Sequence, residues 1–364
     1  MTRETSQALA LIRWPLIMCI VAVHVFAPGT VSVHGTEFDL ASVPEFAGLW
    51  KCVSAFLMEN GVATFFFISG YLFFTGGEMT LERYRTKVRS RVRSLAVPYL
   101  IWNAIAVLFL CMLALPVFRR FLPEFELSRF IPSAGHFFKG FVMNDLHGYP
   151  HNAPMWFLRD LMLCVALALP VNYLMDRTRW AVVGLLGALC LYLYTQPPGY
   201  PLLIVSALFF FYFGGYLAKR GHDLLGFFSR WKYAAYILYP LLGVAFMYAD
   251  GVDHRLAMFI KSVNLMVVIA LAVNLAGYLV RHRGMRANRF LNGATFFVFA
   301  AHFIGLDYYR KILLTAFHPQ SGAAVVAVFI AGYFLLLGFL LLTYFCLDRL
   351  APRVAAVLTG KRSS

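Results

Sequence analysis

Residues 8–28 read ALALIRWPLIMCIVAVHVFAP, an apolar run long enough to cross a bilayer, which takes roughly 20 residues. Two polar side chains interrupt it, Arg13 and His24. In an α-helix, side chains eleven positions apart lie within about 20° of each other around the axis. An arginine at the centre of a spanning helix costs on the order of 2.5–3.5 kcal/mol on insertion scales. We therefore expect Arg13 and His24 to line a polar channel inside a helix bundle.

The positions of Arg13 and His24 also have a purely structural interpretation. Arg13 could extend its side chain to the cytoplasmic interface, and His24 could lie at the opposite interface. Their shared face favours the functional interpretation, in which a neutral imidazole near pH 7 takes a proton from a hydroxyl.

Apolar character extends over the whole chain. Of its 364 residues, 61% are hydrophobic and 13% are charged, and the mean hydropathy is +0.71. This composition predicts an all-α fold, a polytopic membrane helix bundle, and excludes a soluble domain. The net charge of +15 could suggest nucleic acid as a partner. The basic residues instead lie in short segments between apolar runs, so we expect no nucleic-acid binding.

About ten apolar runs predict transmembrane helices. They lie near residues 8–28, 50–74, 95–117, 154–175, 180–196, 201–218, 233–249, 256–280, 293–315 and 322–347. The second run contains Glu59-Asn60-Gly61, so its helix either begins near Val62 or is broken there. Residues 118–153 are predicted to form the longest loop. We expect one membrane domain over residues 1–350 and a short basic cytoplasmic tail over residues 351–364.

Lysine and arginine are concentrated in alternate connections, and most of the other connections are nearly devoid of them. Because basic residues favour the cytoplasmic side, this asymmetry predicts that both termini are cytoplasmic.

The densest run of charge lies between the second and third apolar runs, where we expect a basic loop. It contains Arg83, Arg85, Lys87, Arg89, Arg91 and Arg93. One interpretation is a topological determinant that binds anionic lipid. A sharper one is a cytoplasmic site for a phosphorylated ligand such as coenzyme A, because arginine forks bind phosphate. The two interpretations are compatible.

Other polar side chains lie inside apolar runs. Ser69, Gly70 and Tyr71 interrupt FFFISGYLFF, residues 65–74, where small residues favour close helix packing or contact with a substrate. His302 could bond a neighbouring polar group or face the same channel as His24.

The segment PMWFLRDL, residues 154–161, opens the fourth run. Trp156 fits an aromatic belt at the interface. Arg159 and Asp160 are costly there unless they are paired or face a cavity, and Asp160 could orient His24.

The chain lacks the sequence motifs of several common kinds of catalytic and metal-binding site. The chain contains no HExxH, GxSxG, Walker or CxxC pattern, so neither a metal site, hydrolysis nor ATP use is predicted.

In their order and spacing these motifs resemble those of the membrane acyltransferase family 3. The matching positions are Arg13 and His24, Phe66–Tyr71, Lys87–Arg93 with Pro98 and Trp102, Trp156–Leu158, and His302. Phe299, Ala10 and Trp14 stand where the family usually has a tyrosine, an acidic residue and a glycine.

The resemblance implies a bundle of ten helices in the bacterial inner membrane. Such proteins move an acyl group, usually acetyl, from cytoplasmic acyl-CoA to a glycan on the outer side. Acetyl-CoA is then a co-substrate, and the acceptor is a hydroxyl of an exported polysaccharide or of its lipid-linked repeat unit. Membrane lipid and a polysaccharide assembly complex are further candidate partners.

Residue roles follow from this expectation. His24 is the expected general base, with Arg13 beside the path of the donor. The basic run, with Ser69 and Tyr71, is expected to hold the donor. Trp156, Arg159, Asp160 and His302 are expected on the acceptor side. The rival interpretation is a transporter that exports a lipid-linked sugar or an anion, because polar residues inside a bundle also suit transport.

Overall fold

The computed structural model describes residues 1–33, 36–58, 60–119, 125–144, 148–197 and 199–361. Six of its helical stretches are long and apolar enough to span a membrane. They are α1 (Arg3–Phe26), α2 (Pro44–Phe56) with α3 (Asn60–Phe74), α4 (Leu81–Arg91) with α5 (Val97–Leu113), α12 (Tyr200–Lys219), α15 (His254–Arg283) and α18 (Gly322–Leu350).

Two further pairs of helices are bent. The axes of α9 (Trp156–Ala166) and α10 (Ala168–Thr178) differ by 58°, and those of α16 (Arg289–Ala301) and α17 (Leu306–Phe317) differ by 90°. Counting each pair as one span gives up to eight spans among the described residues. The remaining predicted runs form α11 (Ala181–Tyr194) and α14 (Lys232–Ala249). The all-α membrane bundle is therefore supported, whereas the count of about ten spans is not confirmed.

Two local expectations need correction. The basic run is helical rather than a loop, because α4 continues through a π-helical turn, Val92–Ala96, into α5. Residues 118–153 are not one open loop, since they include the short helices α7 (Leu127–Phe130) and α8 (Ala134–Lys139). For the second apolar run, α2 ends at Phe56 and α3 begins at Asn60, which favours the alternative of a broken helix over one that begins near Val62; Glu59 lies outside the described residues.

The bundle also contains a small β-hairpin, which the all-α expectation missed. Strands β1 (Thr30–Val33) and β2 (Thr36–Asp39) are antiparallel, with Thr30 opposite Asp39. The remaining short helices are η1 (Leu40–Ser42), α6 (Pro116–Arg119), η3 (Ala153–Met155), α13 (Leu224–Ser229) and α19 (Pro352–Leu358).

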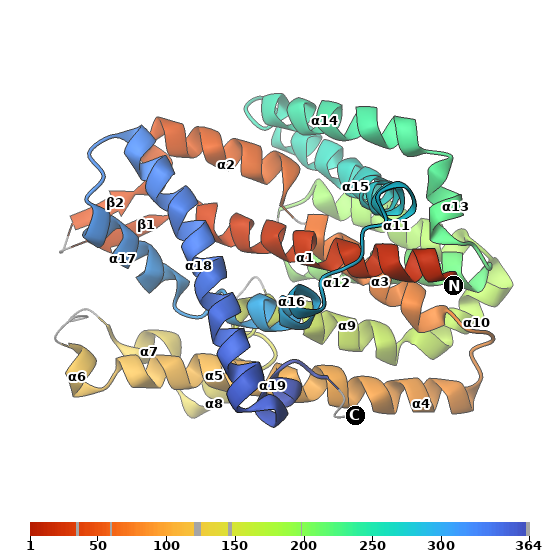
Figure 1. The fold of residues 1–364 in the computed structure, drawn as a ribbon, viewed down its shortest axis with the longest axis horizontal. Coiled ribbons are helices and arrows are strands. Elements are labelled where there is room, and N and C mark those ends of the chain that lie inside the picture. The colour runs from red at the N-terminus through yellow and green to blue at the C-terminus, as the bar shows by residue number, and fades with distance from the viewer. Residues whose placement is uncertain (34–35, 59, 120–124, 145–147, 198, 362–364) are drawn as a thin grey trace.

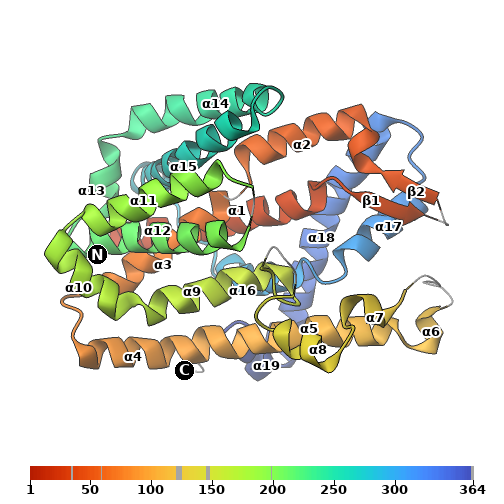
Figure 2. The ribbon, with the colours of Figure 1, turned by 180° about the vertical axis from the view of Figure 1, so that it is seen from behind.

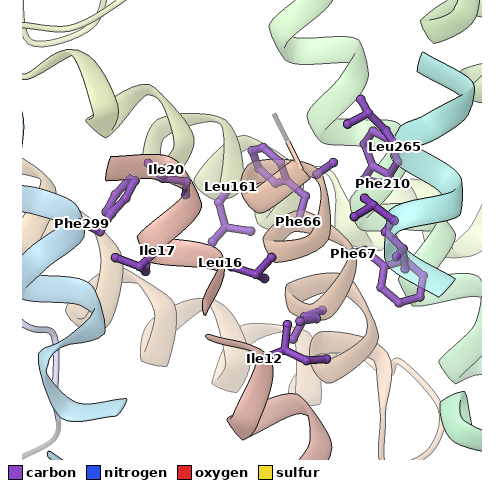
Figure 3. Packing of buried hydrophobic residues seen from close by; sticks show 14 of the residues in the cluster. Ile12, Leu16, Ile17, Ile20, Phe66, Phe67, Leu161, Phe210, Leu265 and Phe299 are labelled. Carbon is purple, nitrogen blue, oxygen red and sulfur yellow. The ribbon is translucent and has the colours of Figure 1, made fainter. Parts of the chain in front are cut away.

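Helix α1 runs through the middle of the molecule and contacts α2, α3, α15, α16 and α18 (Figure 1). Figure 3 shows its residues Ile12, Leu16, Ile17 and Ile20 packed among side chains of other helices. Burial of apolar surface contributes about 25 cal/mol per Å² to the free energy of folding. The many buried contacts of α1 therefore hold this helix in place.

The two ends of the molecule differ. The hairpin and α17 lie at one end, and α10, α13 and the N-terminus lie at the other (Figures 1 and 2). The basic helix α4 belongs to the half that holds the N-terminus and continues into α5 along one edge.

Candidate functional site

Arg13 and His24 lie near opposite ends of one stripe on α1. Ile17 and Ile20 occupy the stripe between them and are 2% and 7% exposed. The stripe therefore faces the bundle, as the cost of a lipid-facing arginine predicts. Because Ile17 and Ile20 are packed in the core, apolar side chains rather than an open polar channel separate the two polar residues (Figure 3). Arg13 is half-buried and makes no hydrogen bond or ion pair with the described residues.

His24 meets His302 where two helices end. Their ring centroids are 5.2 Å apart, and the edge of Phe303 packs at 5.1 Å from His24. His302 follows the last residue of α16, just before the chain turns into α17. The turn uses Gly305 at φ +74°, a left-handed conformation that favours glycine. The structure thus brings the two histidines together from positions 278 residues apart.

The hydrogen bonds of His302 define its tautomer. Its Nδ1 lies 2.7 Å from the carbonyl oxygen of Phe299, so Nδ1 carries the proton and donates. Nε2 is then an acceptor, and it is buried without a partner among the described residues. A buried polar atom without a partner costs about 1–3 kcal/mol. A hydroxyl of a ligand, or a water, would therefore bind favourably at Nε2.

Arg310 on α17 completes this cluster, and the sequence analysis missed it. Its Nη2 donates to the carbonyl oxygens of His24, Val25 and Ala27 at the end of α1. The side chain is 8% exposed, and its ion pair with the exposed Asp307 is 3.9 Å long. The available signal was a charged residue inside a predicted apolar span, which usually marks a functional position.

Arg159 and Asp160 form an ion pair on α9. Arg159 Nε lies 2.7 Å from Asp160 Oδ1, and Asp160 is fully buried. Arg159 also donates to the carbonyl oxygens of Val142 and Gly148. The pair therefore holds the segment before α9 against the bundle. No contact joins Asp160 to His24 among the described residues, so its role in orienting His24 stays a prediction.

Trp156 packs at the start of α9. Its ring lies 6.1 Å from that of Phe66 on α3. The neighbouring Phe157 lies 4.5 Å from Phe66 and 5.8 Å from Phe299, one turn before His302. Aromatic contacts thus connect α9 to the helix that carries His302.

The basic side chains of α4 and of the π-helical turn that follows it fall into two groups. Arg83 donates to the carbonyl oxygens of Thr75 and Glu78, and Lys87 donates to that of Phe73. These two side chains satisfy carbonyls left unpaired at and after the end of α3. Arg85, Arg89 and Arg93 are exposed and make no hydrogen bond or ion pair with the described residues. They remain available to a ligand; Arg91 is half-buried.

Gly70 and Tyr71 pack α3 against α12. A Cβ on Gly70 would lie 1.8 Å from the carbonyl oxygen of Phe211, so only glycine permits this approach. Tyr71 is 3% exposed, and its hydroxyl donates to the carbonyl oxygen of His222. Ser69 is half-buried beside them. This geometry favours the packing interpretation of the motif.

The start of α1 is anchored by Asp223. Its carboxylate accepts hydrogen bonds from the hydroxyls of Thr5 and Thr2 and from the amide of Gly226. Burial alone would raise the pKa of this carboxyl, but these donors and the charge of Arg281 outweigh it and lower the pKa. Helix α1 is therefore fixed at both ends, by Asp223 and by Arg310.

Among the residues that the structure describes, no group of three or more His, Cys, Asp or Glu side chains could hold a metal ion.

Comparison with known proteins identifies the family. The family model described as "Acyltransferase domain", that of acyltransferase family 3, matches residues 6–345. The chain is 27% identical over 373 residues to the succinoglycan biosynthesis protein ExoH of Rhizobium meliloti (strain 1021). That match covers 100% of this chain and 94% of the relative. No solved structure matches the chain. The protein therefore belongs to acyltransferase family 3.

Proposed function

We propose that this protein transfers an acetyl group from cytoplasmic acetyl-CoA to a polysaccharide hydroxyl at the periplasmic side of the bacterial inner membrane. The observation that carries the proposal is the meeting of His24 and His302 inside a chain of the acyltransferase family. The similarity to a succinoglycan biosynthesis protein supports an exopolysaccharide, or its lipid-linked repeat unit, as the acceptor.

The donor would bind at the half of the molecule that holds α4. Arg85, Arg89 and Arg93 supply charge-assisted donors for the phosphates of coenzyme A. The acyl arm would then extend from the level of Arg13 toward His24 beside Ile17 and Ile20, which fill the stripe between these two residues. At ~1.5 Å per residue, Arg13 and His24 are about 16 Å apart along the axis, so an extended arm is required.

The chemistry needs one positioned base. His24 takes the proton of the acceptor hydroxyl as its oxygen attacks the thioester carbonyl carbon. A C–O bond forms, the C–S bond breaks, and the proton passes from His24 to the departing sulfur of coenzyme A. His302 Nε2, already oriented by the bond from Nδ1 to Phe299, accepts a hydrogen bond from the acceptor sugar. This arrangement supplies proximity and base catalysis without a metal.

A comparison of cells with and without the protein separates the proposal from an exporter. A transferase predicts unchanged amounts of surface polysaccharide with less acetyl per sugar residue. An exporter of lipid-linked sugar predicts less polysaccharide with unchanged acetyl per sugar. In isolated membranes, labelled acetyl-CoA should pass label to polysaccharide only when the protein is present.

A further inference from the structure

The carbonyl of His24 is one of the last four of α1, which have no partner amide inside the helix. A helical carbonyl normally accepts from the amide four residues later. For His24 that residue is Pro28, which has no N–H. The carbonyl of His24 therefore needs another donor, since an unpaired buried carbonyl costs about 1–3 kcal/mol.

Arg310 supplies that donor from a distant part of the chain. A single nitrogen, Nη2, contacts the carbonyl oxygens of His24, Val25 and Ala27. The guanidinium thus replaces the missing amide and ties α17 to the last turn of α1. Its positive charge also complements the negative end of the α1 dipole.

The segment formed by α16 and α17 contacts His24 at two places, its imidazole ring and its backbone. His302 directly follows α16 and lies against the imidazole ring of His24, whereas Arg310 lies at the start of the second turn of α17 and bonds the backbone of His24. The 90° bend between α16 and α17 makes both contacts possible. A shift of α1 relative to this bend would separate the two imidazole rings.

We propose that Arg310 is a positioning residue for acyl transfer. By bonding the end of α1 it holds His24 against His302, and it acts through His24 rather than on the reacting atoms. The inference rests on the proposed function of His24. A misplacement of about 1 Å can lower a catalytic rate about 100-fold, so loss of this support should appear in kcat.

The test compares R310M, R310K and K311M in the purified full-length protein. Methionine keeps much of the apolar stem and removes the donors. Lysine presents up to three N–H donors from one nitrogen, enough to bond the carbonyls that the two hydrogens of Nη2 share. K311M is the matched control, because Lys311 is the next cation on α17 and has no hydrogen bond or ion pair with the described residues. Size-exclusion profiles and thermal unfolding establish which variants fold.

We expect R310M to lower kcat about 10- to 100-fold, with the KM for acetyl-CoA within about twofold of wild type. R310K should recover most of that loss, and K311M should match wild type. A folded R310M with wild-type kcat overturns the proposal. A folded R310K as inactive as R310M also overturns it, because the bonded carbonyls would then not explain the effect.

A second readout does not depend on acyl transfer. Diethyl pyrocarbonate modifies neutral imidazoles, and mass spectrometry reports its rate at His24. Without the hydrogen bonds from Arg310, that rate should rise several-fold in R310M, whereas it should stay near the wild-type rate in R310K and in K311M. An unchanged rate in a folded R310M, or a rate in R310K as high as that in R310M, contradicts the inference. If H24Q keeps full activity while the modification rate responds to R310M, the proposed function fails and the structural link stands.

Discussion

Gly70 shows how one residue sets the spacing of two helices. A Cβ at this position would lie 1.8 Å from a backbone oxygen of Phe211, and a backbone atom cannot move aside as a side chain can. Gly70→Ala should therefore force α3 away from α12 and destabilise the protein by about 1–3 kcal/mol or more. Thermal unfolding of the purified protein measures this effect.

Gly338 on α18 is the matched control for Gly70. A Cβ there meets nothing within 4 Å, so Gly338→Ala should leave the unfolding temperature unchanged or slightly raised. Equal stability of the two alanine variants would contradict the close approach of α3 and α12.

Asp223 gives a pH-dependent prediction at the start of α1. Because its pKa is lower in the folded protein than in the unfolded chain, its contribution to stability is present above the unfolded pKa of about 3.9. That contribution is lost as the pH falls through the folded pKa. D223N should unfold at a lower temperature than wild type at pH 7, and the difference between the two should shrink as the pH falls below about 4. A difference that does not shrink as the pH is lowered below about 4 would contradict this assignment.

Individual residues show which features of the site can be predicted from the sequence and which cannot. The spacing of Arg13 and His24 predicts a shared face, because helical geometry depends only on neighbours along the chain. The contact between His24 and His302 was one of two alternatives, and the sequence could not choose between them. The bonds from Arg310 to the end of α1 depend on a fold-level contact that spans 286 residues, so no local pattern contains them.

At the scale of elements, the basic side chains of α4 and of the turn after it have two roles, since some bond the protein backbone and others are exposed and free to bind a ligand. Arg85, Arg89 and Arg93 are exposed, and we expect their replacement by glutamine to raise the KM for acetyl-CoA several-fold or more. Each charge-assisted phosphate contact is worth about 1.5–3 kcal/mol, so loss of three contacts should be measurable. Steady-state kinetics of the triple variant measures this change.

The control for α4 removes the same charge elsewhere. Arg283, Arg286 and Arg289 are exposed at the connection between α15 and α16, so their triple glutamine variant should keep the wild-type KM. R83Q/K87Q should instead lower thermal stability, because those side chains bond carbonyls near the end of α3. If the triple glutamine variant of Arg85, Arg89 and Arg93 folds well and keeps the wild-type KM, these arginines do not bind the donor and serve only to set the topology.

Hydropathy patterns did not predict the bends in two of the apolar runs. The runs near 154–175 and 293–315 each predict one transmembrane helix, yet each forms two helices with a bend between them. Gly305 was the local signal for the second bend, since glycine readily adopts the left-handed conformation found there. The helical form of α4 escaped prediction because its charge suggested a loop, although arginine and lysine are good helix formers.

At the scale of the whole molecule, the distribution of charge predicts one orientation. Single cysteines in a cysteine-free background test it with a maleimide that cannot cross membranes. K139C on α8 should react in intact cells, because we place that segment outside. R230C and R353C should react only after the membrane is opened. Labelling of R353C in intact cells would contradict a cytoplasmic C-terminus.

The central claim is that His24 is the base for acyl transfer. The most direct measurement compares the transfer rates of H24Q and H24A with wild type, using H136Q at a half-buried position on α8 as the control. Glutamine keeps size and hydrogen bonding but cannot accept the proton, and base catalysis contributes about 10²–10⁴-fold. The account predicts that H24Q is as inactive as H24A while acetyl-CoA binding persists, that H302A loses less activity, and that H136Q is normal. An H24Q enzyme that acetylates polysaccharide at nearly the wild-type rate would contradict it.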